Sequence, residues 1–209
     1  MGVDTVTGYV GPQTALEGPG PAVRQLRDGS LGIAEVHGRY YEAAYRKNLY
    51  TASVLGQAVT VVGTSMTGLI LVNNSAAGGG GVNLALQKIG FQETVTAASA
   101  TSVGLAWFNT GGTYGSTTLT PVTPVPGFLG AGGGKAGAYS AVNSTVGTPV
   151  EMFAFLHNTA AIATTGEDIG ADLDLEGSIL VPPGFGVCLC AVGASATGNG
   201  YIQWEEVPA

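Results

Sequence analysis

The sequence has 209 residues, of which only 10% are charged and 35 are glycine, and its formal net charge at pH 7 is −7. Its seven lysines and arginines argue against nucleic acid as a partner, because affinity for a phosphate backbone comes from clustered basic side chains. No apolar run reaches the roughly 18 residues of a membrane-spanning helix, so we expect no membrane partner either.

The low charge also predicts that the protein assembles. Free monomers normally carry charges at roughly 25–35% of their surface residues, and charged residues are scarce in this chain. We therefore expect much of the surface to be covered by other copies of the chain or by other proteins.

Two features predict a reducing, cytoplasm-like compartment for synthesis. Residues 1–10 lack the basic start and the apolar centre of a signal peptide. The two cysteines, Cys188 and Cys190, are neighbours on one face of a predicted strand, where a disulfide between them has poor geometry. We expect two buried, reduced thiols.

The first 50 residues predict an extended N-terminal arm with one short helix. Residues 1–21 are rich in glycine, proline and threonine and show no hydrophobic period, which indicates either a disordered tail or an arm that neighbouring molecules order. Between residues 38 and 48, apolar residues recur with helical spacing, and Glu42 precedes Arg46 by about one helical turn. This pattern predicts a short amphipathic helix with an internal ion pair.

Basic and aromatic side chains of this arm are candidates for contacts with other subunits. The arginines are interspersed with acidic residues, and tyrosine rings favour a surface that is apolar on one side and wet on the other. The predicted contact residues are Arg24, Arg27, Arg39, Tyr40, Tyr41, Tyr45 and Arg46.

Residues 51–209 have the pattern of a single all-β domain. Clusters of glycine, serine, threonine, asparagine and proline separate eight predicted strands. These strands span residues 57–62, 68–73, 82–94, 102–110, 150–158, 173–181, 184–192 and 200–207. Eight antiparallel strands of this length predict a jelly-roll β-sandwich, in which two sheets share one core.

The last thirty residues predict the most buried part of this domain. Two prolines at 182–183 end one strand, and the unbroken apolar run 185–192 is typical of a strand covered on both faces. We expect this strand to form a hairpin with residues 200–207, on which Ile202 and Trp204 share one face.

The longest segment without a predicted strand is residues 111–148, which contains three prolines and a run of three glycines. A loop this long in a compact domain usually functions in contacts. Residues 130–136 resemble a phosphate-binding loop only in composition, because the glycine spacing and the Ser or Thr after Lys135 are missing. We interpret them as a flexible loop.

No catalytic motif accompanies the strands in the sequence. His37 and His157 are isolated from metal-binding and nucleophile motifs, and we expect His157 to be a strand-end residue with an ordinary hydrogen-bond partner. Trp107, Phe108 and Trp204 lie at strand ends, where we expect them to fill the sandwich rather than to stack on sugars.

The densest group of charges is acidic and lies at residues 167–176. Strand alternation places Asp172, Asp174 and Glu176 on one face. Carboxylates at this spacing are compatible with a Ca²⁺ site, above all where a threefold axis brings copies together, although the calcium-loop pattern is absent. The other interpretation is a solvated strand face that prevents edge pairing.

Several segments resemble virion proteins of tailed bacteriophages. The tyrosine-rich segment 38–50, the strand 67–74, and the closing Pro-Pro-Gly (182–184) and Trp-Glu-Glu (204–206) segments carry this resemblance. In particular, the chain is similar to head decoration, or cement, proteins with a trimeric jelly-roll fold like that of tumour necrosis factor. The resemblance implies a homotrimer on the outer surface of the capsid, with N-terminal arms laid over the major capsid protein, and neither a catalytic site nor a cofactor.

We therefore expect a structural protein that stabilises a phage head. A head-fibre or receptor-binding knob that grips host carbohydrate through residues 111–148 is the alternative, and the aromatic residues of that loop are Tyr114, Phe128 and Tyr139. An enzyme that cleaves a polysaccharide needs a pair of carboxylates in a cleft, for which the acidic group is the only source in the sequence.

Overall fold

The computed structural model describes residues 40–63, 66–75, 81–95, 100–109, 119–144, 149–158 and 170–209. The chain divides into two units, residues 1–41 and 42–209, and every described strand belongs to the second unit. The prediction for residues 1–21 lies outside the described residues.

One short helix precedes eleven strands in the described part of the chain. The helix α1 spans Tyr41–Tyr45, and the strands are β1 (Leu49–Val59), β2 (Met66–Val72), β3 (Val82–Val95), β4 (Thr101–Asn109), β5 (Leu119–Val122), β6 (Val125–Pro126), β7 (Gly137–Ser144), β8 (Val150–Asn158), β9 (Gly170–Val181), β10 (Phe185–Val192) and β11 (Ala196–Pro208). Each of the eight predicted strands overlaps an observed one.

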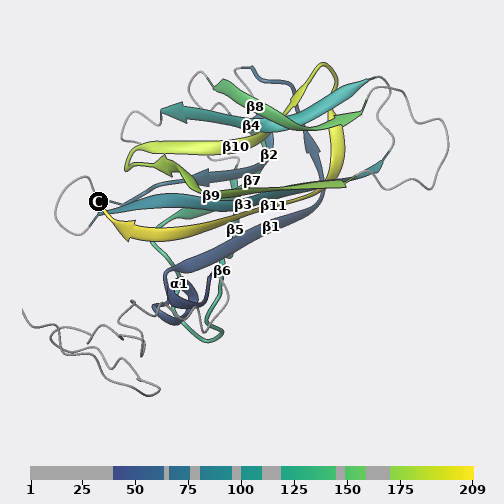
Figure 1. Ribbon diagram of the computed structural model, residues 1–209. Coiled ribbons are helices and arrows are strands. Elements are labelled where there is room, and N and C mark those ends of the chain that lie inside the picture. The colour runs from purple at the N-terminus through teal and green to yellow at the C-terminus, as the bar shows by residue number, and fades with distance from the viewer. Residues whose placement is uncertain are drawn as a thin grey trace, which may run out of the picture. The chain divides into compact units, whose positions relative to one another are not determined.

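The strands form two antiparallel sheets that face each other as the layers of a sandwich (Figure 1). The five-stranded sheet has the order β6-β1-β11-β3-β9, and the six-stranded sheet has the order β5-β7-β2-β10-β4-β8. The pairing is nested, because β1 pairs with β11, β2 with β10, β3 with β9 and β4 with β8. This nesting of eight strands is the jelly-roll topology, so the predicted all-β jelly-roll sandwich is confirmed.

The central strands of the six-stranded sheet are buried on both faces. Leu69, Leu71 and Leu189, from β2 and β10, face the main core between the sheets. The residues that alternate with them, such as Ile70 and Cys188, belong to a second buried cluster on the other face. The prediction that the apolar run forming β10 is covered on both faces is therefore confirmed.

The predicted C-terminal hairpin is wrong, because β10 and β11 lie in different sheets. β10 pairs with β2 and β4, whereas β11 pairs with β1 and β3, so each strand is central in its own sheet. The chain leaves β10 at Gly193, whose φ of 98° suits glycine. Ile202 and Trp204 are fully buried together in the main core, as their spacing predicts.

The helix predicted over residues 38–48 ends early, at Tyr45. Lys47 has a φ of 63°, and its N–H and that of Asn48 bond back to carbonyl groups of α1, which closes the helix in a Schellman motif. β1 therefore begins at Leu49, and the last two residues of the expected arm belong to the sandwich.

Residues 111–148 contain three strands where a loop is predicted. β5 and β6 are edge strands, and they carry Pro121 and Pro126. Proline has no N–H to donate to a ladder, so it is tolerated at a sheet edge. The prolines thus mark edge strands as well as turns. Residues 111–118 and 145–148 of the predicted loop lie outside the described residues.

Replacement of Leu189 by alanine tests the packing between the sheets. Leu189→Ala is expected to lower the free energy of unfolding by about 2–5 kcal/mol, because it leaves a cavity in a close-packed core. Leu55 on β1 is 78% exposed, so Leu55→Ala removes the same atoms from the surface. This control is expected to change the free energy by less than about 0.5 kcal/mol. Urea denaturation followed by circular dichroism measures both variants, and equal losses would contradict the assignment of the core.

Candidate interaction surfaces

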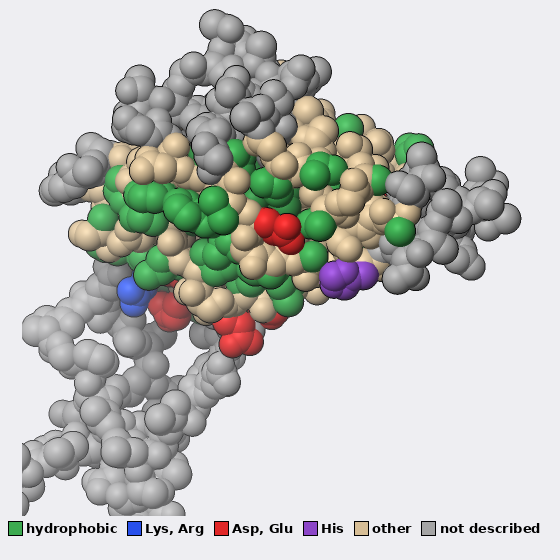
Figure 2. Space-filling view, turned by 90° about the horizontal axis from the view of Figure 1, so that it is seen from above, with side chains coloured by type: hydrophobic (Ala, Val, Ile, Leu, Met, Phe, Trp, Pro, Cys, Tyr) green, Lys and Arg blue, Asp and Glu red, His purple; other side chains and the backbone are tan. Residues whose placement is uncertain are grey.

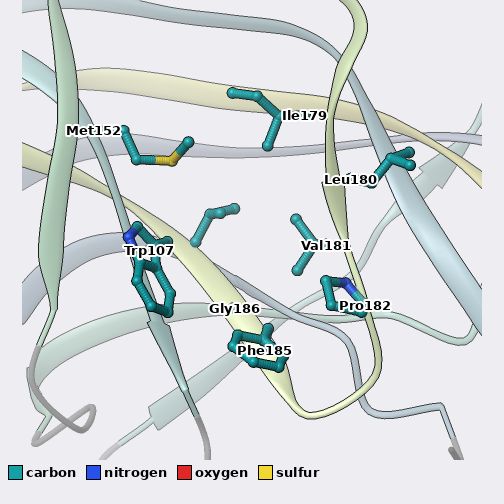
Figure 3. Close-up of a pocket in the computed structure, with 9 residues that line it drawn as sticks. Trp107, Met152, Ile179, Leu180, Val181, Pro182, Phe185 and Gly186 are labelled. Carbon is teal, nitrogen blue, oxygen red and sulfur yellow. The ribbon is translucent and has the colours of Figure 1, made fainter.

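A groove of about 230 Å³ opens where the two sheets separate at one edge of the sandwich. At this edge β8 is the last strand of the six-stranded sheet and β9 is the last strand of the five-stranded sheet. Trp107 and Met152 line one side and Val181 and Pro182 line the other, with Phe185 below them in the view of Figure 3. None of the residues that line the groove carries a charge.

Trp107 is exposed because it lies at the end of β4. Leu105, two residues earlier, faces the main core and is fully buried, whereas Trp107 continues the same face beyond the core and is 40% exposed. Its ring centroid lies 6.0 Å from that of Phe185, with 33° between the ring planes. The prediction of buried aromatic rings is therefore wrong for Trp107 and confirmed for Phe108 and Trp204, which are fully buried.

The size of the groove indicates the kind of ligand that fits it. Pockets for drug-sized molecules occupy roughly 300–1,000 Å³, so this groove is small for such a molecule. Apolar pockets at the centre of protein interfaces accept single anchor side chains. Hydrophobic side chains also gather over much of the face that Figure 2 shows, with few charged side chains among them. The groove is therefore a candidate site for contact with a protein.

Asn73 positions one wall of the groove. It follows β2, is 1% exposed, and its side-chain amide donates to two carbonyl oxygens of the other sheet, Val82 O at 2.7 Å and Val181 O at 2.8 Å. Its backbone N–H donates to Phe185 O at 2.9 Å, and its carbonyl accepts the Gly184 N–H at 3.1 Å. One buried residue thus ties the turn between β9 and β10 to β2 and β3.

Asn73 is not among the predicted site residues, although the sequence carries a local signal for it. The Ser75 N–H donates to Asn73 Oδ1 at 3.1 Å, which is an Asx turn, and an asparagine at the end of an apolar strand is typical of such a turn. The turn predicts where the strand ends. It does not predict that the amide reaches carbonyl groups that are 9 and 108 residues away along the chain.

A second apolar surface lies in the segment after β6. Leu129 is 81% exposed and Phe128 is 43% exposed, and we call these two residues the loop tip. The Gly127 N–H donates to Leu49 O at 2.7 Å, which attaches the start of the segment to β1. Lys47 Nζ lies 5.4 Å from the centroid of the Phe128 ring, within the range of a cation–π interaction.

Glu206 holds the other end of this segment. Its side chain is nearly buried, and its Oε1 accepts the N–H groups of Lys135 at 2.6 Å and Ala136 at 2.9 Å. Gly134 has no room for a Cβ, because the Glu206 carboxylate lies against it. Burial and then the Glu206 charge raise the pKa of Tyr50. The glycine-rich segment therefore offers its N–H groups to a carboxylate of the same chain.

The predicted contact residues fall in two groups. Three lie outside the described residues, and they are Arg24, Arg27 and Arg39. Four are described, and they are Tyr40, Tyr41, Tyr45 and Arg46. On α1, Tyr41 is 41% exposed and Tyr45 is 60% exposed. Arg46 Nε lies 3.4 Å from Glu42 Oε2, which confirms the ion pair, while the role of these residues in contacts stays a prediction.

Asp172, Asp174 and Glu176 are exposed on the edge strand β9, as their alternation predicts. Asp172 Oδ2 lies 3.3 Å from Lys88 Nζ, and this hydrogen bond, followed by the influence of Tyr201, raises the pKa of Lys88. Among the described residues, no three His, Cys, Asp or Glu side chains come together to hold a metal ion. The three acids fit a solvated edge, and a Ca²⁺ site shared by three copies stays a prediction.

His157 has an ordinary hydrogen-bond partner, as expected of a strand-end residue. Its Nδ1 lies 2.9 Å from Ser102 Oγ, the residue directly opposite on β4. Neither residue lines the groove. The pair is therefore interpreted as a contact between strands, and His37 lies outside the described residues.

Burial controls the chemistry of the two cysteines. Cys188 and Cys190 are free thiols without exposed surface. Both lie on β10 and belong to the second buried cluster. Burial raises the pKa of both thiols, that of Cys190 to about 12. The reactive thiolate is scarce at neutral pH, and the prediction of two buried thiols is confirmed.

Comparisons with known proteins assign no family. No protein-family model matches the chain, and neither a curated protein nor a solved structure matches it. None of the helices in the described ranges is long and apolar enough to cross a membrane. The class that the structure defines is an all-β jelly-roll sandwich, and the resemblance to phage decoration proteins stays a prediction.

Replacement of Asn73 by alanine tests whether its amide holds the groove. Asn73→Ala is expected to lower the free energy of unfolding by at least about 2 kcal/mol, because two buried carbonyl groups lose a donor. The neighbouring Asn74 is exposed, so Asn74→Ala is the matched control. Urea denaturation measures stability, and the fluorescence of Trp107 reports on the groove. An Asn73→Ala variant as stable as the control would contradict the role of the amide.

Thiol labelling tests the burial of the cysteines. At about pH 8 a disulfide-exchange reagent is expected to leave both thiols of the native protein unmodified, because their raised pKa and their burial suppress the thiolate. The same reagent is expected to titrate two thiols in urea. Rapid modification of the native protein would contradict the buried placement of β10.

Proposed function

We propose that this chain is a structural protein of a virion, a decoration protein that assembles as a homotrimer and stabilises a bacteriophage head. Its partners are other copies of itself and the major capsid protein, and it has neither catalytic activity nor a cofactor. It is made in the host cytoplasm and acts on the outer surface of the capsid.

The observation that supports this proposal best is the exposure of large apolar side chains at two separate places on the sandwich. In the groove, Trp107 is 40% exposed, Met152 is 41% exposed and Leu180 is 57% exposed. In the loop tip, Leu129 is 81% exposed. Apolar side chains gathered at a surface mark sites of contact with other proteins. The low charge of the chain agrees with a surface that is covered in the assembled state.

Attachment to the capsid combines several weak contacts. Residues 1–21 lose conformational entropy when they bind, which weakens each single contact. Apolar area that is buried at the same time contributes roughly 25 cal/mol per Å². Three arms on one trimer act together, because binding of the first raises the effective concentration of the others.

A head-fibre or receptor-binding knob is the alternative function. Phe128 favours it, because this ring is 43% exposed in the segment expected to grip carbohydrate. Binding on a glycan array that Phe128→Ala abolishes would favour the knob. A polysaccharide-cleaving enzyme has less support, because the described acids of β9 lie on an open edge strand and not in the groove.

Deletion of residues 1–21 tests the role of the arm. The shortened chain is expected to keep its circular dichroism spectrum and its trimer mass, because the described sandwich begins later in the chain. Its occupancy on purified phage heads is expected to fall at least about tenfold, because the contribution of linked contacts is lost.

The matched control for this deletion replaces residues 1–21 by a Gly/Ser segment of the same length, which keeps the reach of the arm and removes its side chains. Occupancy is counted by electron microscopy and by gel densitometry of sedimented heads. Unchanged occupancy of both variants would contradict attachment through the arm, and failure of the full-length chain to bind heads would contradict the proposed function.

A further inference from the structure

The loop tip and the groove lie on opposite edges of the sandwich. In the five-stranded sheet β6 is one edge and β9 is the other, and the loop tip follows β6 while the groove lies beside β9. Figure 1 shows β6 at the lower side of the sandwich and β8 at its upper side. Because the two surfaces are different, a contact between them joins copies head to tail.

The two surfaces are complementary in shape and polarity. Leu129 projects from a loop with most of its side chain in solvent, and the groove is an apolar hollow of about 230 Å³. No charged residue lines the groove, so a leucine or phenylalanine side chain that enters it meets no buried charge. The volume suits an anchor side chain, which is the typical centre of a protein interface.

The charges around the two surfaces are also complementary. Lys47 follows α1 and lies beside the loop tip, with its Nζ 5.4 Å from the centroid of the Phe128 ring, and Lys135 lies in the segment that carries the loop tip. At the groove, the exposed Glu151 directly precedes Met152 on the edge strand β8. The loop tip therefore has a positive charge beside it and the groove has a negative charge beside it, which favours this orientation over others.

Both surfaces are held in place before any contact forms. Glu206 and Leu49 fix the two ends of the segment that carries the loop tip, and Asn73 fixes the wall of the groove. Groups that are already ordered lose less entropy on association. The anchor and its pocket are therefore prepared for binding.

We propose that the loop tip of one copy inserts Leu129, supported by Phe128, into the groove of the next copy, between Trp107, Met152 and Phe185. Repeated head to tail, this contact forms a ring of three when successive copies are related by a rotation of about 120°, which the proposed trimer requires. The inference rests on the proposed function, because it takes the trimer from it, and it names the surfaces that form that trimer.

Two acidic substitutions test the contact. Leu129→Glu disables the loop tip, and Met152→Glu disables the groove, where Met152 is 41% exposed and tolerates a polar side chain. Native mass spectrometry of the wild-type protein is expected to show the mass of three chains of 20.8 kDa each. Each variant is expected to show the mass of a single chain. The protein concentration at half assembly is expected to rise at least about 30-fold, as for a residue that dominates an interface.

Leu55→Glu is the matched control, because Leu55 is 78% exposed on β1 and belongs to neither surface. It is expected to keep the three-chain mass. Circular dichroism confirms that each variant is folded, and Leu129→Ala serves as a milder variant with the same direction of effect.

Mixing the two variants tests the head-to-tail geometry. The Met152→Glu chain has an intact loop tip and the Leu129→Glu chain has an intact groove, so an equal mixture is expected to form pairs of one chain of each kind. Absence of such pairs would overturn a contact between these two surfaces.

Trp107 supplies a local readout, because the other tryptophan of the chain, Trp204, is fully buried. Iodide is expected to quench Trp107 less in the wild-type trimer than in the Leu129→Glu variant. Equal quenching in both would overturn insertion into this groove.

The outcomes separate this inference from the proposed function. If both acidic variants keep the three-chain mass, or if the wild-type chain stays single at every concentration tested, the inference is overturned. If the trimer forms through these surfaces and does not bind phage heads, the inference stands and the proposed function fails.

Discussion

The structure depends on one buried amide that joins the two sheets at their rim. Asn73 ends β2 in the six-stranded sheet, yet both protons of its side-chain amide go to carbonyl groups of the five-stranded sheet, on Val82 and Val181. Loss of a hydrogen bond to a buried carbonyl destabilises the folded state, so this residue holds the two sheets together here. Because its backbone also pairs with Phe185, the same residue sets the wall of the groove.

The groove lies where the edge strands of the two sheets separate. Between the central strands the sheets share a closed core, whereas at β8 and β9 the last strands diverge and leave Trp107 half covered. At the opposite edge lie β6 and the loop tip. Leu129 of the loop tip is 81% exposed. Apolar exposure at both edges, with little charge to balance it, is the physical basis for proposing an assembled state.

The prolines and the glycine-rich segment show how local signals mislead. Pro121 and Pro126 indicate a break in regular structure, and they lie instead in strands whose outer side has no ladder to disturb. The segment around Gly134 has the composition of a flexible loop, and a carboxylate from the last strand holds it. In both cases the deciding partner is remote in the sequence, so no local pattern contains it.

The sequence by itself determined where most strands lie and which of them are buried, because side-chain alternation and turn residues are local properties of a strand. It was sufficient for β10, whose unbroken apolar run requires cover on both faces, and for Ile202 and Trp204, whose spacing places them in one core. Only the tertiary structure decided which sheet each strand joins, which placed β10 and β11 in different layers. It also decided that Trp107 lies at an open edge, since a hydrophobic pattern indicates the direction in which a side chain points and not whether a neighbouring strand covers it.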